Sequence, residues 1–258
     1  MKTTNSLLRR TAALALAAVL ALGSQAFAYN GAALAAVLAG ADAPDADLSG
    51  ADLSGADLTG LDLKHADLSG ASLLGARLEK ADLTGADLSG TNLKRAVFAE
   101  AVLDGAKLAG ADGPYAFFGK ASLNKADLSG ANFYRADFRG AKLQGVWGRG
   151  GRFQEASFDQ ADLSGGTYSF ANFSYTWMYQ ADLSGTTLDS VNLYATDGRQ
   201  LKAPGADFTS ATLSNADLTG ADLTGAVMQN AVLTRTNLKG ARLEDVQWGT
   251  AFLRGARF

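Results

Sequence analysis

Residues 46–60 read ADLSGADLSGADLTG, the same five-residue block three times over. Each block carries Ala, Asp, Leu, a small hydroxyl residue and Gly. The phase persists to the end of the chain: of the 43 positions 48, 53, 58 and so on to 258, 26 are Leu and nine are Phe. At the positions two residues earlier, 31 of 43 are Ala. A repeat this regular predicts the shape of the chain before any residue is given a role.

The five-residue period excludes a helix and a flat sheet. At ~100° per residue, steps of five would spread successive Leu around a helix, and an odd period would send them to alternate faces of a strand. Side chains two residues apart share a face of an extended segment, so Ala51 and Leu53 point inward together. One extra outward residue then turns a corner before Ala56. The repeat predicts a coil with a corner in every block and coils stacked at ~4.8 Å.

Blocks such as ADLSG resemble those of the pentapeptide-repeat family, whose pattern is Ala-(Asp/Asn)-Leu-x-x, over residues 46–258. The resemblance implies an all-β fold: a right-handed quadrilateral parallel β-helix, a pentapeptide-repeat solenoid with four blocks, or twenty residues, in each coil. The repeats would then make nearly eleven coils and a rod about 50 Å long.

Sorting the apolar centres into columns twenty residues apart predicts how the core packs. Two columns bring aromatic rings together along the axis of the rod, where they should form its stiffest part. These columns are Phe98, Phe118, Phe138 and Phe158, and Phe133, Phe153 and Phe173.

Three breaks interrupt the apolar centres while keeping the five-residue phase. They lie at residues 113–114, 148–151 and 197–204, where Gly replaces a large residue. We interpret them as bulges or short loops; the alternative is surface loops that bear a partner site.

The first 28 residues have the pattern of a secretory signal peptide. Basic residues precede an apolar run over 11–22, which is too short to span a bilayer, and Ala-Phe-Ala at 26–28 fits a cleavage site. We expect cleavage after Ala28 and a periplasmic or secreted protein, the alternative being an uncleaved membrane anchor. The expected domains are the signal peptide (1–28), an N-terminal cap segment (29–45) and the β-helix (46–258).

The two ends of the rod need covering because an open coil exposes a sheet edge. Residues 30–41 suit a short capping helix with Asn30 as its N-cap and an apolar side formed by Leu34, Val37 and Leu38.

At the other end, Trp248, Phe252 and Phe258 are candidate contacts of an end-to-end homodimer. Sedimentation as a monomer at micromolar concentration would contradict this prediction.

Residue types for catalysis and metal binding are scarce. The chain has no Cys and a single His, His65, at an outward turn position, so neither a transition-metal site nor a Ser-His-Asp triad is expected. The Asp ladder at the start of the repeat lacks the Gly-rich pattern of calcium-binding rolls. We therefore predict no enzyme activity and no catalytic, cofactor-binding or metal site.

Charge is mild and unevenly distributed. Residues 1–28 hold three basic and no acidic residues, so 20 basic and 26 acidic residues remain after cleavage, a net charge of −6. The column of blocks that begins at 46 is net −4 and the next one net +3. This difference indicates either chance scatter on a solvated surface or two distinct docking faces.

Aromatic residues at outward positions are the least expected feature of a solvated repeat. Five of the nine gather near one part of the chain and form a candidate interaction surface. The alternative is that they cover bulges near Gly148 and Gly198. The five are Phe170, Tyr175, Trp177, Tyr179 and Tyr194, and the others are Tyr115, Phe117, Tyr134 and Trp147.

Three functions remain in view. The first is a non-enzymatic exported scaffold that binds a protein or an envelope polymer, without nucleic acid and without a stable membrane span. The second is a DNA mimic that interacts with gyrase, which the family resemblance implies for some members. The third is a glycan-binding or glycan-processing β-helix. Export and the mild charge oppose the second, and no carboxylate pair stands out for the third.

Overall fold

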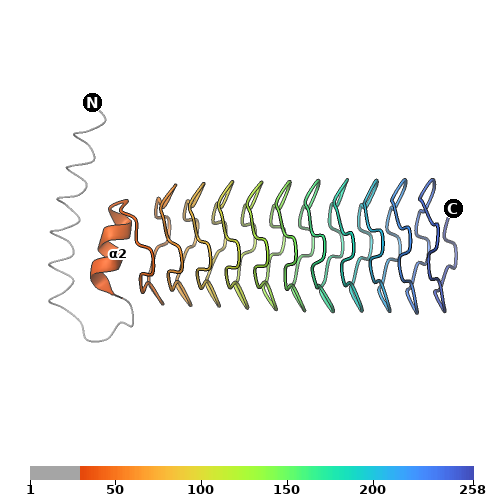
Figure 1. Cartoon of the computed structure of the whole chain (residues 1–258), viewed down its shortest axis with the longest axis horizontal. Helices are drawn as coiled ribbons and strands as arrows, with labels where there is room; N and C mark the ends of the chain where they lie inside the picture. The colour runs from red at the N-terminus through yellow and green to blue at the C-terminus, as the bar shows by residue number, and fades with distance from the viewer. Residues whose placement is uncertain (1–29) are drawn as a thin grey trace, which may run out of the picture.

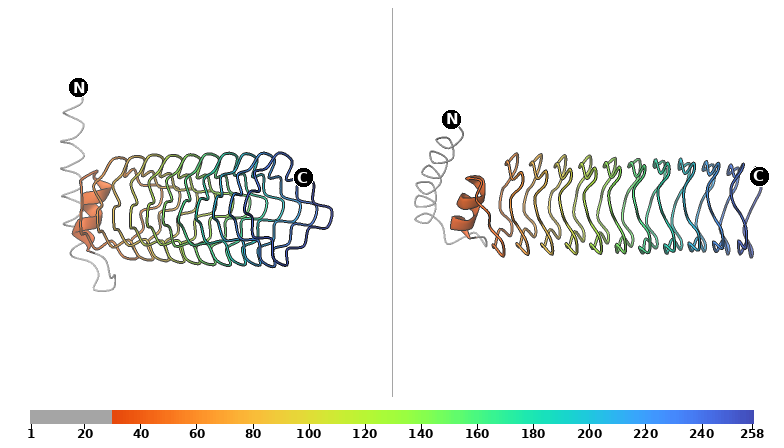
Figure 2. Two further views of the ribbon diagram at one scale, coloured as in Figure 1. Left: turned by 45° about the vertical axis from the view of Figure 1, so that its right-hand side comes forward. Right: turned by 45° about the horizontal axis from the view of Figure 1, so that its top comes forward.

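The computed structural model describes residues 30–258, which wind into a rod with the helix α2 (Gly31–Leu38) across one end (Figure 1). The colour runs steadily from one end of the rod to the other, so each coil lies on the one before it (Figure 2). The expected signal peptide, residues 1–28, falls outside the described residues. No helix within residues 30–258 is long and apolar enough to cross a membrane.

Parallel β-bridges join each coil to the next with the twenty-residue spacing that the resemblance implies. Each block contributes one bridging residue, so the described residues form columns of single bridges in place of continuous strands. The columns define four faces: face A (Asp47 to Gln247), face B (Asp52 to Phe252), face C (Asp57 to Arg257) and face D (Asp62 to Arg242).

The backbone of each block is hydrogen-bonded to the coils on either side. The amide of Leu48 donates to the carbonyl of Asp67 at 2.7 Å, and the amide of Asp67 donates back to Ala46 at 2.8 Å. The corner closes where the amide of Ala51 donates to the carbonyl of Leu48 at 3.0 Å. Gly50 supplies the left-handed backbone of this turn, with φ of 67°. The corner position therefore favours Gly throughout the rod.

The Asp or Asn before each apolar centre braces the corner that follows. Oδ1 of Asp47 accepts a hydrogen bond from the amide of Ser49 at 3.1 Å, and Oδ1 of Asp127 accepts one from Ser129 at 2.9 Å. Such side chains mimic a backbone turn. The repeated Asp thus has a structural use in its own block.

The predicted aromatic columns are confirmed. From Phe98 to Phe158, the four rings of the first column stack at centroid distances of 4.8, 4.9 and 4.8 Å, with interplanar angles of 3° to 4°. In the second column, the ring of Phe153 lies 6.1 Å from Phe133 and 4.8 Å from Phe173. All seven are fully buried. The middle of the rod therefore has a continuous aromatic core.

The interpretation of the three breaks as bulges, short loops or surface loops is wrong. The bridge columns continue through them, joining Asp112 to Asn132, Trp147 to Thr167 and Asp197 to Asp217. Each missing side chain instead makes room for a large one from the next coil. A Cβ atom on Gly113 would lie 2.7 Å from Cε1 of Phe133, one on Gly148 2.6 Å from Cε1 of Tyr168, and one on Gly198 2.8 Å from Cδ2 of Leu218.

Tyr168 fills the most crowded of these spaces. Its ring is fully buried, and a Cβ atom on Gly166 would lie 2.7 Å from its Cε2 atom. Its hydroxyl has no hydrogen-bond partner among the described residues. Burial raises the pKa of Tyr168, so the phenol stays protonated at ordinary pH. The buried ring fills the space, and its hydroxyl adds no hydrogen bond.

Helix α2 lies across the first coil, and Asn30 caps it by accepting hydrogen bonds from amides of its first turn. Leu34 and Val37 are buried in the core, whereas Leu38 is 47% exposed. The helix ends three residues before the expected end, because Gly40 takes a left-handed φ of 79° and its amide bonds back to Val37 at 2.9 Å.

Candidate functional site

Seven of the nine aromatic residues that the repeat pattern placed outward lie on face C and the two corners that border it, and we call this set the aromatic face. Phe117 and Trp177 occupy bridge positions of face C. The other five lie in turns directly before or after bridge positions of face C. The aromatic face comprises Tyr115, Phe117, Tyr134, Tyr175, Trp177, Tyr179 and Tyr194.

The structure divides the candidate surface expected from the sequence. Tyr175, Trp177, Tyr179 and Tyr194 share the aromatic face, but Phe170 occupies the corner between faces A and B. There its ring lies 5.3 Å from the guanidinium carbon of Arg149. The alternative role of these aromatics, covering bulges, is excluded because no bulges exist at Gly148 or Gly198.

The aromatic face contains the same arrangement twice. Tyr115, Phe117 and Tyr134 recur sixty residues later as Tyr175, Trp177 and Tyr194, which is three coils, or about 14 Å, along the rod. The two Tyr pairs make the same edge-to-face contact, with centroids 5.9 Å apart in the first pair and 5.4 Å in the second. Edge-to-face packing fixes the orientation of the rings. The face is therefore a preformed surface with two equivalent aromatic clusters.

Two of these tyrosines occupy backbone positions that favour Gly. Tyr115 and Tyr175 are corner residues, each with φ of 61°. A bulky residue in this region is an outlier that costs free energy, and elsewhere in the same column Gly55 and Gly75 fill the position. Arg95, Glu155 and Arg235 occupy the same column with φ of 58°, 55° and 60°, so the left-handed corner is a property of the repeat and not of the aromatic residues.

The region between the two clusters is held by a network around Arg135. Its guanidinium carbon lies 5.8 Å from the ring centroids of both Tyr115 and Tyr134, and its Nε atom lies 3.1 Å from Oε2 of Glu155. The hydroxyl of Tyr134 donates to Oε1 of Glu155 at 3.0 Å. This hydrogen bond raises the pKa of Tyr134. The network orders the side chains without leaving a net local charge.

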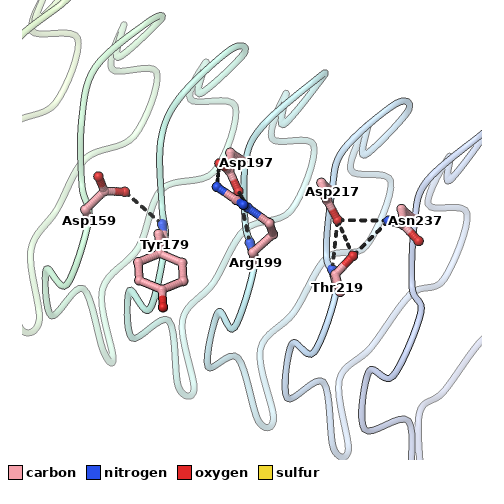
Figure 3. Close-up of polar contacts among 7 residues, drawn as sticks. All are labelled: Asp159, Tyr179, Asp197, Arg199, Asp217, Thr219 and Asn237. Carbon is pink, nitrogen blue, oxygen red and sulfur yellow. Dashed lines mark hydrogen bonds and ion pairs between the residues drawn. The ribbon is translucent and has the colours of Figure 1, made fainter.

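Polar contacts continue along face C and the corner that joins it to face D (Figure 3). Asp159 accepts a hydrogen bond from the amide of Tyr179 at 2.9 Å, and Arg199 forms a bidentate pair with Asp197 at 2.8 and 2.7 Å. The hydrogen bond from Arg199 holds the pKa of Asp197 below its usual range. Farther along, the side chain of Asn237 donates to Asp217 at 3.1 Å. The charged groups of this face are therefore mostly paired.

Two hollows open on the aromatic face. One, of about 450 Å³, extends from Tyr115 to Trp177 and is also bordered by Arg135, Arg139 and Glu155. The other, of about 370 Å³, is bordered by Glu155, Tyr175, Thr176, Trp177, Ala195 and Asp197. Glu155 and Trp177 border both, so the two hollows adjoin.

The structure also places the other residues that the sequence singled out. Residues 30–258 contain no group of three or more His, Cys, Asp or Glu side chains arranged to hold a metal ion. His65 is an exposed corner residue with φ of 55°. At the last coil, Phe252 and Phe258 are 60% and 64% exposed, and Trp248 packs edge-to-face on Phe258 at 6.1 Å.

The family model for pentapeptide repeats matches this chain in eight copies, which fall within residues 35–112, 115–146, 169–197 and 204–246. The chain belongs to the pentapeptide-repeat family. Its fold is a right-handed β-helix solenoid, as the resemblance of the repeats implies. A comparison with functionally curated sequences gave no match.

Solved structures similar to this chain are also pentapeptide-repeat proteins. HetL, a pentapeptide repeat protein involved in heterocyst differentiation regulation from the cyanobacterium Nostoc sp., is 30% identical, with a TM-score of 0.50. The match covers 84% of this chain and 89% of HetL. QnrB1, a plasmid-mediated fluoroquinolone resistance protein, is 18% identical over 72% of this chain and 90% of QnrB1, with a TM-score of 0.32. A TM-score this low supports no functional argument.

Proposed function

We propose that this protein is a non-enzymatic, exported rod that binds a protein or an envelope polymer through its aromatic face. The observation that carries the proposal is the recurrence of one exposed aromatic cluster on the same face of the rod, at Tyr115 and Phe117 and again at Tyr175 and Trp177. Exposed aromatic side chains in one zone are typical of contact surfaces.

The paired charges of the aromatic face indicate the kind of partner. Arg135, Arg139 and Arg199 each lie within ion-pair distance of a carboxylate of the same face. Binding to nucleic acid needs cations free to neutralise phosphates, and mimicry of DNA would need dense unpaired carboxylates. A neutral or weakly charged partner therefore suits this surface better than nucleic acid or gyrase does.

Export remains part of the proposal and rests on the signal-peptide pattern of residues 1–28. Periplasmic or secreted localisation would place the aromatic face in contact with envelope proteins and polymers. Self-association through Trp248, Phe252 and Phe258 also stays a prediction, with sedimentation as its test.

The test of the proposed function compares three immobilised forms of the protein in a crosslinked envelope extract. The site variant combines Tyr175→Gly, Trp177→Thr and Tyr194→Ser. The control variant combines Trp147→Ser and Phe170→Gly, which removes aromatics that are at least as exposed from other parts of the rod. We expect a partner to be enriched by the wild type and the control, with enrichment falling at least about tenfold for the site variant.

Stability is measured alongside binding. Tyr175→Gly relieves left-handed strain, so we expect the site variant to melt within a few degrees of the wild type. Equal enrichment by all three forms, or none above a bare matrix, would contradict the proposed function.

A further inference from the structure

The hollow of about 370 Å³ on the aromatic face differs in its chemistry from its neighbours. Two aromatic side chains, Tyr175 and Trp177, and two carboxylates, Glu155 and Asp197, border it, and no basic residue does. The adjoining hollow of about 450 Å³ contains two arginines. A hollow of about 710 Å³ along face D contains Lys202 and Arg242 but no aromatic residue. The smallest of the three therefore suits a cation best.

The hollow exists because Ala195 lacks a long side chain. Ala195 is a corner residue with φ of 54°, and the same column has Tyr175 one coil earlier and Asn215 one coil later. Its methyl group leaves open the space that a longer side chain would cover. Thr176 lies behind it, 1% exposed, and its hydroxyl donates to the carbonyl of Phe173 at 2.7 Å. The inner wall is thus small and largely apolar.

The walls are fixed by contacts that lie outside the hollow. The ring of Tyr175 packs edge-to-face on Tyr194 at 5.4 Å. Neither Arg135, which pairs with Glu155, nor Arg199, which pairs with Asp197, borders the hollow. A ligand would therefore meet ordered aromatic faces and ordered carboxylates.

The hydrogen bonds of the carboxylates indicate which cation fits. Oε1 of Glu155 accepts from the hydroxyl of Tyr134, and Oε2 lies beside Nε of Arg135. Both oxygens of Asp197 accept from Arg199. A primary ammonium has three N–H donors that need acceptors, and every one of these oxygens already has at least one donor, so few lone pairs remain for it. A quaternary ammonium has no N–H donor and needs only negative potential and aromatic faces.

We propose that this hollow binds a quaternary ammonium group, such as that of choline. Trp and Tyr faces attract organic cations through the ring quadrupole, and this attraction is how aromatic cages recognise quaternary ammonium ligands. Glu155 and Asp197 border the hollow while their arginines do not, so their carboxylates add a short-range attraction that the arginines partly cancel. Because both are paired with arginines, we expect a dissociation constant in the millimolar range.

The site goes beyond the proposed function, because a small cation could bind here whether or not the rod binds a macromolecule. Loss of partner enrichment with intact cation binding would contradict only the scaffold proposal. Absence of cation binding with intact, face-dependent enrichment would contradict only this one.

The test is saturation-transfer NMR of the N-methyl protons of choline and tetramethylammonium with the purified protein, at constant ionic strength. We expect saturable binding of both cations and at least about tenfold weaker binding of the uncharged tert-butyl analogue of choline. Equal binding of the uncharged analogue, or no saturable binding of either cation, would overturn the proposal.

Two variants locate the site, and a third serves as a control. Ala195→Asn fills the hollow with a residue that Asn215 and Asn230 show to be compatible with the same backbone, so binding should be lost while the melting temperature is kept. Trp177→Leu keeps apolar bulk and should weaken binding about tenfold. Trp147→Leu, on face A, should leave binding unchanged. Unchanged affinity in Ala195→Asn and Trp177→Leu would overturn the proposal.

Vesicles distinguish the two sources of the ligand. Cosedimentation with phosphatidylcholine vesicles that is stronger than with phosphatidylglycerol vesicles and is abolished by Ala195→Asn would support the site and identify a lipid head group. Binding of free choline without cosedimentation would support the site and identify a soluble cation.

Discussion

Replacing Phe118 by Ala is expected to lower the free energy of unfolding by about 3–5 kcal/mol. The ring of Phe118 is fully buried, and it stacks on Phe98 at 4.8 Å and on Phe138 at 4.9 Å. It also packs edge-to-face on Phe133 at 5.4 Å. Its removal would leave a cavity in a core whose backbone is held in place by bridges to both neighbouring coils, so the space cannot close by collapse.

The preceding residue provides a matched control. Phe117 carries the same side chain but points outward and is 47% exposed. Phe117→Ala should change the free energy of unfolding by less than about 0.5 kcal/mol. Guanidinium denaturation followed by circular dichroism measures both variants. Similar losses in the two variants would contradict the alternation of inward and outward residues.

Much of the fold could be predicted because one small pattern is repeated many times. Each block repeats the same local rules: Ala near the corner, a large apolar centre and Gly at the left-handed turn. An irregularity at one block, such as Arg95 in place of Gly at a corner, does not change the fold, because the neighbouring blocks keep the same backbone conformation. The stacking of Phe98 on Phe118 followed directly from a twenty-residue column.

The three breaks could not be explained at the level of a single block. Gly113 looks like a missing side chain when it is read along the chain, whereas its space is filled by Phe133 from the next coil. The sequence already contained the large residue that fills the space, Phe133, twenty residues later in the same column. Comparing side-chain volumes down each column, in addition to counting apolar centres, would have predicted compensation in place of bulges.

The aromatic face was predicted only in part, for a related reason. Position along the chain grouped Phe170 with Tyr175, although face B separates the two corners in which they lie. The three-coil relation between Tyr115 and Tyr175 is visible only when residues are sorted by face. The hollow beside Ala195 depends on side-chain orientation and on which arginine pairs with which carboxylate, and no repeat pattern specifies those.

Replacing Gly148 by Leu, which restores the repeat pattern, is expected to destabilise the rod by at least about 3 kcal/mol. Even the first added carbon would lie 2.6 Å from Cε1 of Tyr168. That ring has no free space to move into, because it is fully buried and Gly166 lies against its other edge, where an added Cβ atom would be 2.7 Å from Cε2. Gly148→Leu combined with Tyr168→Leu should recover most of the stability, since the column would then run Leu128, Leu, Leu, Leu188. Tyr168→Phe, which removes only the unpartnered hydroxyl, should be neutral or slightly stabilising. Denaturation midpoints of Gly148→Leu, of Tyr168→Leu and of the double variant complete a double-mutant cycle with the wild type. A tolerated Gly148→Leu, or a double variant no more stable than that single one, would show that Gly148 does not act by making room for Tyr168.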